Sequence, residues 1–369
     1  MDRHDLSGAT AKDVAQAHQE DLKIQEQYGC KGLTYWFDEE RGAAFCLVEA
    51  PNQDSVSEMH KHAHGLVPHQ IIEVESNIVE SFLGRIQDPK PANDIDDSGL
   101  LIINDPAFRA ILAIELEGIE LLNHNYDHNT SNKFSKSYSQ LIEEILSQFK
   151  GIEVEHVKDG LLNSFNSISN AVDAAMEFQT RLQILATKLG VKLQSKIGLS
   201  AGVPVTKDKN FFGETIQESM RLCKTASGGQ IMVSSSINNY LSEDKLNQLT
   251  KKTSVKVLKP AEQKFLKQMR EVIDNNWNDP EFTVKSFNTI MILSKSQLYR
   301  KIVALTGLSP NDFIKEYRLK KSLRILSETQ RTISEIAYDS GFNSPSYFSK
   351  CFQKRYGISP TNFLQLKQV

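Results

Sequence analysis

The strongest constraint on the fold is a seven-residue phrase that the chain carries twice near its C-terminal end. GLSPNDF occupies residues 307–313, and GISPTNF occupies residues 357–363. At the same offset, further pairs of positions agree in identity or class: Ser294 with Ser344, Ser296 with Ser346, Leu298 with Phe348, and Ile302 with Phe352. A repeat of this length predicts two copies of one supersecondary unit.

Each copy has the signals of a helix with defined ends. A serine stands at the N-cap position, apolar residues recur at helical spacing, and a glycine precedes a Ser-Pro pair that opens another helix. Before the second copy, TISEIAYDSGFNS predicts a short helix, a turn at Gly341 and a helix capped by Ser344. This is the helix-turn-helix arrangement, whose second helix can enter the major groove of DNA. The helical stretch FIKEYRLKKSLRILSE would join two such units, so that one chain addresses two successive grooves.

These segments resemble the AraC-type DNA-binding domain of bacterial transcription regulators. The resemblance is carried by ISEIAYDSGFNSPSYFSKCFQKRYGISPTNF and, more weakly, by LSKSQLYRKIVALTGLSPNDFIKEYRL, within roughly the last 105 residues. The first copy departs from the pattern, because Phe287 and Met291 stand where Ala337 and Gly341 stand in the second. We expect the first unit, which lacks the turn glycine, to be tilted or more weakly docked on DNA.

The resemblance implies that the second helix of each unit is the recognition helix. Gln and Arg side chains can read base edges, whereas Ser, Lys and Tyr more often contact phosphates. For any one of these polar residues, ordinary solvent exposure is the alternative to a DNA contact. The predicted DNA-binding residues are Ser296, Gln297, Arg300, Lys301, Ser346, Tyr347, Ser349 and Lys350.

Charge is unevenly distributed along the 369 residues. From Lys264 to Val369 there are 17 Lys and Arg against 9 Asp and Glu, so this part carries about +8 and the first 263 residues about −11. A basic module of this kind favours a polyanionic partner, although a solvated charged face would give the same count.

The length predicts two or three domains. Two polar seams, at 85–99 and 241–265, divide the chain into a first domain (1–80), a linker (81–104), a second domain (105–243), a linker (244–262) and a third domain (263–369). The four cysteines form no C-x-x-C pair, so neither a disulfide framework nor a cysteine-only zinc site is indicated. The sequence has no run of about 18 apolar residues and no export signal, so we expect a cytoplasmic protein without membrane contact.

The first domain has the order strand, helix, strand, strand, helix, strand, which predicts a ferredoxin-like plait. His60 and His64 are four residues apart and share one helix face, a spacing that many metal sites use. Asp2 and His4 share one face of the first strand, and Cys46 lies in a later strand. Imidazole, carboxylate and thiolate suit nickel, copper, zinc or cobalt, although a solvated helix that is rich in histidine by chance would show the same spacing.

The phrases MDRH, YWFDEERGAAFCLVEAP and HKHAHGL are similar to a small ferredoxin-like bacterial family described as nickel-binding. The similarity spans about the first 75 residues. It implies that His4, Cys46, His60 and His64 bind Ni²⁺ or another divalent transition metal. A small organic ligand in the same cavity is the alternative, and so is a plait that only contacts a protein partner.

The second domain alternates strands and helices, and its phrases resemble the class III nucleotide cyclase catalytic domain over about 130 residues. The resemblance places Glu115 and Asp159 as metal-binding carboxylates and Arg221 as the arginine that stabilises the transition state. Other positions depart from the family: Glu155 replaces the lysine that recognises the base, Asn210 the purine-selecting aspartate, and Gln217 the asparagine near the ribose. We therefore expect a non-catalytic domain that dimerises or relays a signal.

The predicted fold is thus an α+β multidomain chain with a plait, an α/β cyclase-like domain and an all-α double helix-turn-helix domain. The predicted function is a homodimeric, double-stranded DNA-binding regulator that responds to a metal or small molecule. The alternative is an active nucleotide cyclase fused to a DNA-binding domain.

Overall fold

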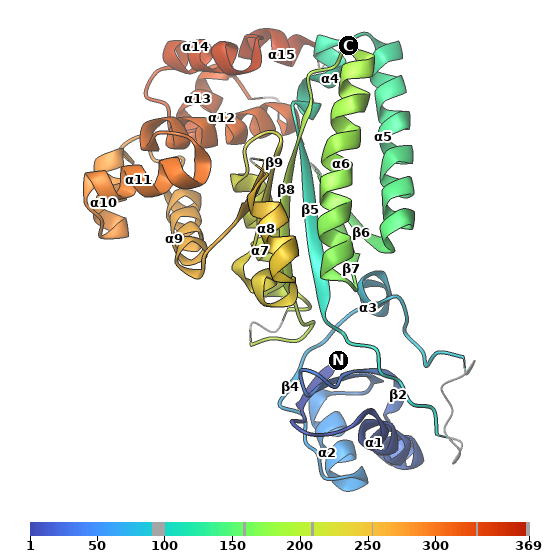
Figure 1. Ribbon diagram of the computed structural model, residues 1–369. Helices are drawn as coiled ribbons and strands as arrows, with labels where there is room; N and C mark the ends of the chain where they lie inside the picture. Colours follow the sequence, from blue (N-terminus) through green and yellow to red (C-terminus); the bar gives the residue numbers. More distant parts are fainter. Residues whose placement is uncertain (91–99, 158–159, 208–209, 253, 330, 367–369) are drawn as a thin grey trace.

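The computed structural model describes residues 1–90, 100–157, 160–207, 210–252, 254–329 and 331–366. Figure 1 shows a small sheet-and-helix domain at one end, a larger sheet with helices on both faces in the middle, and an all-helical domain beside the far end of that sheet. The predicted α+β multidomain fold is confirmed.

The first domain is an antiparallel sheet with strand order β2-β3-β1-β4, covered by two helices. The predicted order of elements is confirmed. Helix α1 begins at a capping box in which the side chains of Thr10 and Asp13 each accept a backbone N–H. The elements are β1 (Asp2–Asp5), α1 (Ala11–Ile24), the 3-10 turn η1 (Gln25–Tyr28), β2 (Lys31–Asp38), β3 (Ala43–Glu49), α2 (Gln53–Ala63) and β4 (Gln70–Ile71).

The two faces of this sheet have different neighbours. Tyr35 and Phe37 pack in one buried cluster with α1. Trp36 and Phe45 alternate with them along the strands and lie in a second buried cluster with residues of the middle domain, among them Phe212. Helix α3 (Ser76–Leu83) contributes to this second cluster, so the plait and the middle domain share one hydrophobic core.

The middle domain has a six-stranded sheet of order β10-β9-β8-β5-β7-β6. Helices α5 and α6 cover one face, while α7 and the C-terminal domain lie against the other (Figure 1). The strands are β5 (Arg109–Glu117), β6 (Gly151–Val157), β7 (Gly160–Phe165), β8 (Gln194–Gly202), β9 (Gln230–Val233) and β10 (Val255–Val257). The helices are η2 (Ile119–Leu121), α4 (Leu122–Asn125), α5 (His128–Phe149), α6 (Ile168–Leu189), α7 (Gly213–Thr225), η3 (Ser235–Tyr240) and α8 (Glu243–Thr250).

Two segments that we predicted as linkers contain ordered elements. Residues 244–262 include most of α8 and all of β10, which is the edge strand of the middle sheet. Residues 81–104 include the end of α3, and Ile103 packs in the cluster of Tyr35 and Phe37. Composition marked both segments as polar, but each carries a few apolar side chains that reach a core.

The C-terminal domain is all helical, as predicted. It consists of α9 (Pro260–Asn276), α10 (Val284–Met291), α11 (Lys295–Thr306), α12 (Pro310–Glu328), α13 (Ile333–Asp339), α14 (Pro345–Tyr356) and α15 (Pro360–Leu366). The predicted caps are confirmed: Ser294 and Ser344 open α11 and α14, and Gly307 and Gly357 close them in the left-handed conformation. Leu298, Ile302, Phe348 and Phe352, the apolar positions that agree between the two copies, are all fully buried.

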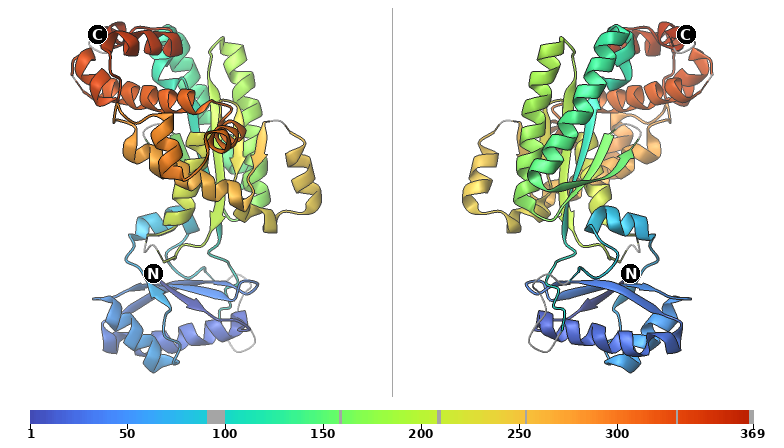
Figure 2. Two further views of the ribbon diagram at one scale, coloured as in Figure 1. Left: turned by 90° about the vertical axis from the view of Figure 1, so that its left-hand side faces the viewer. Right: turned by 90° about the vertical axis from the view of Figure 1, so that its right-hand side faces the viewer.

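The C-terminal domain packs directly on the middle domain. Leu222 of α7 and Met232 of β9 share a core with Phe265 of α9, and Leu121 shares a core with Leu319 of α12. The two views in Figure 2 show that the plait and the helical domain lie at different ends of the middle domain. Within the described residues, no helix is both long enough and apolar enough to span a lipid bilayer.

Candidate functional site

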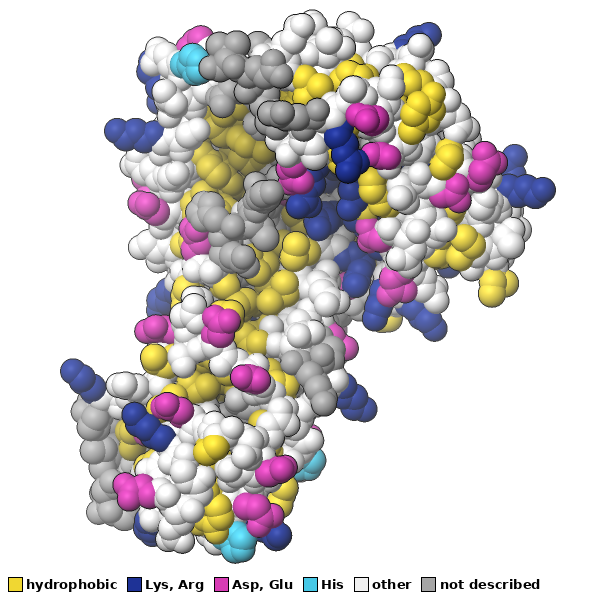
Figure 3. Space-filling view, turned by 180° about the vertical axis from the view of Figure 1, so that it is seen from behind, with side chains coloured by type: hydrophobic (Ala, Val, Ile, Leu, Met, Phe, Trp, Pro, Cys, Tyr) yellow, Lys and Arg dark blue, Asp and Glu magenta, His cyan; other side chains and the backbone are white. Residues whose placement is uncertain are grey.

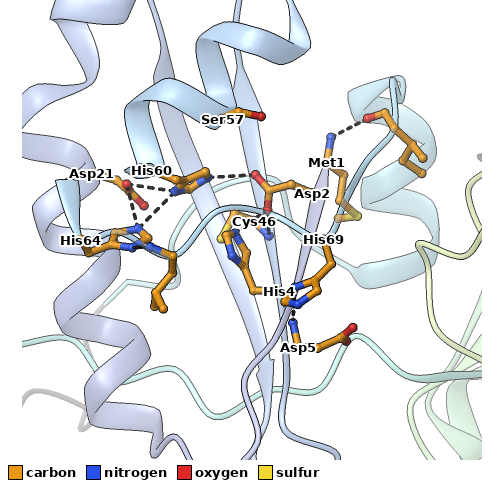
Figure 4. A network of polar contacts seen from close by, with 12 residues as sticks. Met1, Asp2, His4, Asp5, Asp21, Cys46, Ser57, His60, His64 and His69 are labelled. Atoms are coloured by element: carbon orange, nitrogen blue, oxygen red, sulfur yellow. Dashed lines mark hydrogen bonds and ion pairs between the residues drawn. The ribbon is translucent and has the colours of Figure 1, made fainter. Parts of the chain in front are cut away.

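A cluster of titratable side chains lies between the sheet of the plait and its two helices. Strand pairing places Asp2 of β1 opposite Cys46 of β3, and His4 lies two residues further along β1 on the same face. Helix α2 brings His60 and His64 to this cluster, and α1 brings Asp21 (Figure 4). The structure therefore brings together all four predicted ligands, and it adds two carboxylates.

His60 is the centre of the cluster. Its Nε2 lies 3.0 Å from Oδ2 of Asp2, and its Nδ1 lies 3.0 Å from Oδ1 of Asp21. The ring is 1% exposed. Burial alone would lower the pKa of His60, but the hydrogen bonds to Asp2 and Asp21 outweigh it and raise the pKa to about 10.

The two carboxylates are stabilised in their charged form. Burial would raise the pKa of Asp2 and of Asp21, but in each case the imidazoles beside the carboxyl group outweigh it and lower the pKa. With His60 charged between them, this buried group carries one more negative than positive charge. An additional cation would neutralise it.

Cys46 is a protonated thiol in this arrangement. Burial, followed by the nearby charges of Asp2 and Asp21, raises the pKa of Cys46 well above its ordinary value. A metal would have to displace this proton, because thiolate rather than thiol is the ligand.

The donor set fits a divalent transition metal. The side chain of His4 is 4% exposed, and its Nε2 has no hydrogen-bond partner in the described part of the chain, although it lies 3.4 Å from Oδ1 of Asp2. A buried polar atom without a hydrogen-bond partner calls for an explanation, and a metal ion bound to this ring nitrogen would supply one. Three imidazoles, two carboxylates and one thiol are together the donors that nickel, cobalt, copper and zinc use.

Sequence reasoning missed Asp21 and had not counted Asp2 among the ligands. Asp21 carried a usable signal, because it follows Val14 and His18 at helical spacing on the buried stripe of α1. A carboxylate on such a stripe needs a buried partner. The remaining nearby histidines lie elsewhere: His18 contacts Asp88 at 3.3 Å, and His62 is exposed.

The C-terminal domain presents the two predicted recognition helices at its surface. Ser296, Arg300, Ser346, Tyr347 and Lys350 are exposed. Ser349 is only partly exposed. These positions all lie in the N-terminal or central turns of α11 and α14.

Two of the predicted DNA-binding side chains already have intramolecular contacts. Oε1 of Gln297 accepts the backbone N–H of Ser294 at 3.0 Å and thereby caps α11. Nζ of Lys301 lies 4.9 Å from the centre of the Phe265 ring. Both side chains would have to leave these contacts to reach DNA.

Both predicted recognition helices, α11 and α14, are attached to the middle domain through their C-terminal turns. In α11, the carbonyl oxygens of Ala304 and Thr306 accept hydrogen bonds from Lys256 and Ser227 of the middle domain. In α14, Arg355 forms an ion pair with Glu117 of β5. In Figure 1 the N-terminal ends of α11 and α14 accordingly point away from the middle sheet.

A cleft of about 1780 Å³ lies between the middle sheet and α12 and α14. Figure 3 shows a column of Lys and Arg side chains along it. Glu115 faces this cleft, and Lys196 stands opposite it on β8. Burial would lower the pKa of Lys320 of α12, but Glu115, the contact with Lys196, and the carboxylates Glu117 and Glu316 together outweigh it and raise the pKa.

The other positions of the cyclase resemblance are not assembled into a described site. Asp159 lies outside the described residues. Arg221 forms an ion pair with Glu218 one turn earlier in α7. Glu115 itself lies beside two lysines of the same chain, Lys196 and Lys320.

Two parts of the chain match known families. Residues 289–366 match the family described as Helix-turn-helix domain, and residues 1–74 match the family described as Nickel responsive protein SCO4226-like.

Among curated proteins, a histidine kinase P4 of Formosa agariphila is 34% identical over 134 residues, which are 34% of this chain and 10% of that protein. The HTH-type transcriptional regulator MtrA of Neisseria gonorrhoeae is 31% identical over 34% of this chain and 39% of its own length. The HTH-type transcriptional activator RhaS of Mannheimia succiniciproducens is 35% identical over 26% of this chain and 35% of its own length. The chain therefore spans well under half of these relatives.

Solved structures with similarity include the DNA-binding domain of AdpA in complex with a target DNA, 22% identical over 27% of this chain and 93% of that chain, with a TM-score of 0.26. Adenylate cyclases from Trypanosoma brucei are 17% identical over 39% of this chain and 80% of that chain, with a TM-score of 0.33.

The fold and these matches define a multidomain chain in which a double helix-turn-helix module is joined to two sheet-containing domains. The C-terminal domain is similar to AraC-type helix-turn-helix domains, and the N-terminal domain is similar to the family described as Nickel responsive protein SCO4226-like.

Proposed function

We propose that this protein is a transcription regulator that binds double-stranded DNA through α11 and α14 and responds to a divalent transition metal held in the plait. The observation that carries the proposal is the orientation of the recognition helices. Both are fixed at their C-terminal turns, and both expose their N-terminal turns away from the middle domain. In helix-turn-helix proteins these N-terminal residues contact base edges.

DNA binding would use the exposed side chains of the two helices. Arg300 can contact a guanine in bidentate fashion, whereas Lys350 and the serines would contact phosphates. Phosphate contacts release counterions, so affinity would fall steeply as salt rises.

The effector would be nickel or a divalent metal of similar ligand preference. His4, Cys46, His60 and His64 supply imidazole and thiolate, and Asp2 and Asp21 supply carboxylate. Bound metal would supply the positive charge that the buried cluster lacks. A small organic cation in the same place is the alternative effector.

The shared cores give the metal cluster a physical route to the DNA-binding helices. Cys46 and Phe45 are neighbours on β3 and face opposite sides of the sheet, one toward the metal cluster and the other toward the middle domain. The middle domain in turn contacts α11, α12 and α14. We propose that it relays the signal, joins two copies in a cytoplasmic homodimer and does not cyclise nucleotides, since Arg221 and Glu115 have partners within the chain.

The test uses full-length protein stripped of metal and a DNA duplex selected from a random library. We expect Ni²⁺ to change DNA affinity at least tenfold, measured by fluorescence anisotropy, and this change to disappear in His60→Ala/His64→Ala. His62→Ala is the matched control, because His62 lies on the same helix but is exposed. A DNA affinity that none of Ni²⁺, Co²⁺, Cu²⁺ and Zn²⁺ changes would refute metal sensing. Failure to select any duplex from the library would refute DNA recognition.

Catalysis by the middle domain is tested separately. The full-length protein is incubated with Mn²⁺ and ATP or GTP, and we expect no cyclic product by chromatography. Product that disappears in Glu115→Ala would overturn the proposal of a non-catalytic relay.

A further inference from the structure

The cleft between the middle sheet and α12 contains an arginine whose hydrogen-bond donors are unused. Arg270 of α9 lines this cleft, and its side chain is only 10% exposed. Its guanidinium forms no hydrogen bond with any residue that the structure describes, and Oδ1 of Asp274 lies 3.9 Å from its Nη2. That oxygen accepts the hydroxyl of Tyr317 instead. A guanidinium is always charged and has five N–H donors, so a buried one without hydrogen bonds indicates a missing acceptor.

The ring of Tyr317 does not replace this acceptor. Cζ of Arg270 lies 4.9 Å from the centre of the ring, which makes a cation–π contact. The ring attracts the positive charge, but it does not supply the oxygen atoms to which guanidinium N–H groups donate.

Two lysines line the same cleft, and neither has a partner of opposite charge. Lys321 of α12 is half-buried, and its Nζ lies 5.4 Å from the centre of the Tyr317 ring. Lys224 lies in the last turn of α7 and is exposed. Neither side chain forms a hydrogen bond or an ion pair with the described part of the chain. Lys224 belongs to the middle domain, whereas Arg270 and Lys321 belong to the C-terminal domain, so the three cations lie at the junction of the two.

The chain itself does not balance these charges. Burial lowers the pKa of Lys321, and the charge of Asp274 opposes this effect. The positive charges of Lys224, Arg270 and Arg324 lower the pKa further. Arg324 has a carboxylate partner of its own one turn later, at 3.0 Å. The other three cations therefore stand against one carboxylate, which leaves two positive charges in excess.

A phosphate group has the properties that these three side chains require. At neutral pH a phosphate monoester carries a charge of about −1.5 to −2 and has three acceptor oxygens. An arginine can donate two parallel hydrogen bonds to it, and lysines act as point charges. We infer that Lys224, Arg270 and Lys321 bind the phosphate group of a small molecule in this cleft. The cleft has a volume of about 1780 Å³, which leaves room for the organic part of such a ligand.

The position of the site argues against two other polyanions. The cleft lies on the side of α12 that faces the middle sheet, whereas the N-terminal ends of α11 and α14 point away from that sheet (Figure 1). DNA held at those ends would not reach the three cations. A nucleoside triphosphate carries more negative charge than the two positive charges in excess, and Glu115 in the same cleft would repel it further.

Calorimetric titration of the full-length protein at constant ionic strength tests this site. We expect glucose 6-phosphate to bind with one equivalent per chain, and glucose, its uncharged counterpart, not to bind. Arg270→Gln and Lys321→Met should each weaken binding at least about tenfold, the loss expected for a hydrogen bond to a charged group. Lys224→Met should weaken it too, and because Lys224 is exposed this variant should keep the fold. Lys136→Met is the matched control, since Lys136 is an exposed lysine on α5, which covers the opposite face of the sheet.

Hydrogen exchange locates the site without any substitution. Inorganic phosphate serves as the probe, because it supplies the phosphate group alone. We expect it to slow backbone exchange in α9 and α12 and to leave exchange in α5 unchanged. If glucose 6-phosphate binds more tightly than inorganic phosphate, the ligand is an organic phosphate; equal affinities would identify free phosphate as the ligand.

The remaining outcomes would overturn the phosphate site. These are no binding of either compound, equal binding by all the variants, or binding of ATP alone. Each of them would leave the proposed DNA binding and metal sensing standing, because those use other residues.

Discussion

Arg355 in the last turn of α14 is ion-paired with Glu117 on strand β5 of the middle sheet, and its Nε donates to Oε1 of Glu316 at 2.7 Å. The side chains of Arg355 and Glu117 are 31% and 28% exposed, so the pair is mostly shielded from water. It joins a helix that we assign to DNA binding to the domain that contacts the plait.

Replacing Glu117 with Gln should weaken the attachment of the C-terminal domain. Loss of a half-buried ion pair costs about 1–2 kcal/mol, between the values for exposed and buried pairs. We expect this decrease in the free energy of unfolding of the full-length protein, measured by urea denaturation. Arg331→Ala is the control, since Arg331 pairs with Asp339 at the surface with 56% and 46% exposure, and it should change the free energy by under about 0.5 kcal/mol.

The same pair should weaken in acid. Burial would raise the pKa of Glu117, but Lys320, Arg355 and Lys196 outweigh it and lower the pKa. A carboxyl group whose pKa is lowered by folding contributes stability that is present above its unfolded pKa of about 4.3 and is lost as pH falls through the folded value. The stability difference between the unsubstituted protein and Glu117→Gln should therefore shrink below about pH 4. A difference that is the same at pH 7 and pH 3.5 would contradict this role of Glu117.

The sequence predicted the C-terminal domain in detail because its signals are local. Caps such as Ser294 and Ser344 and closing glycines such as Gly307 act within a few residues of themselves. The error there was also local: aligning the copies at a constant offset placed Met291 opposite Gly341, whereas Ile292 takes the left-handed conformation. The second turn is one residue longer, which a constant offset cannot detect.

The candidate metal site and the domain contacts were less predictable, because they depend on residues far apart in sequence. His60 and His64 were predictable as an i, i+4 pair, but their partner Asp21 lies on a different helix 39 residues before His60. The pairing of Glu117 with Arg355 spans 238 residues and had no local signal. The short strand β10 was missed for the same reason, because it is recognisable only by its pairing with β9.

Gly341 should tolerate no side chain. Its φ is +75°, and a Cβ atom would lie 2.6 Å from the carbonyl oxygen of Trp277 and 2.8 Å from Nε of Arg318. Gly341→Ala therefore combines backbone strain of about 1 kcal/mol with a steric clash, and we expect a loss of about 3 kcal/mol in the free energy of unfolding. Gly357→Ala is the matched control, because Gly357 has a φ of +78° and open space around it. Equal losses in the two variants, measured by urea denaturation, would contradict the steric argument.

Ile292 should be replaceable with a gain in stability. It has a φ of 52° and is 90% exposed, so a β-branched residue adopts a strained conformation without burying its side chain. Ile292→Gly should raise the free energy of unfolding by about 0.5–1 kcal/mol, since relief of strain exceeds the added flexibility of the unfolded chain. Ile290→Gly, two residues earlier within α10, should instead lower it by about 1 kcal/mol. Thermal unfolding of both variants checks the opposite signs.

Arg300 and Lys350 should affect DNA binding in different ways. Arg300→Ala should cost about 1–3 kcal/mol of affinity for the selected duplex and relax its preference at one base pair, because a bidentate contact to guanine carries sequence information. Lys350→Ala should weaken binding to all duplexes alike, because a phosphate contact carries no sequence information. It should also reduce the slope of log affinity against log salt by about 1. Anisotropy titrations at several salt concentrations measure both quantities, with Lys188→Ala on helix α6 of the middle domain as a control for the loss of one surface charge. If Lys188→Ala and Lys350→Ala gave the same slope, Lys350 would not contact DNA, and the orientation proposed for α14 would be wrong.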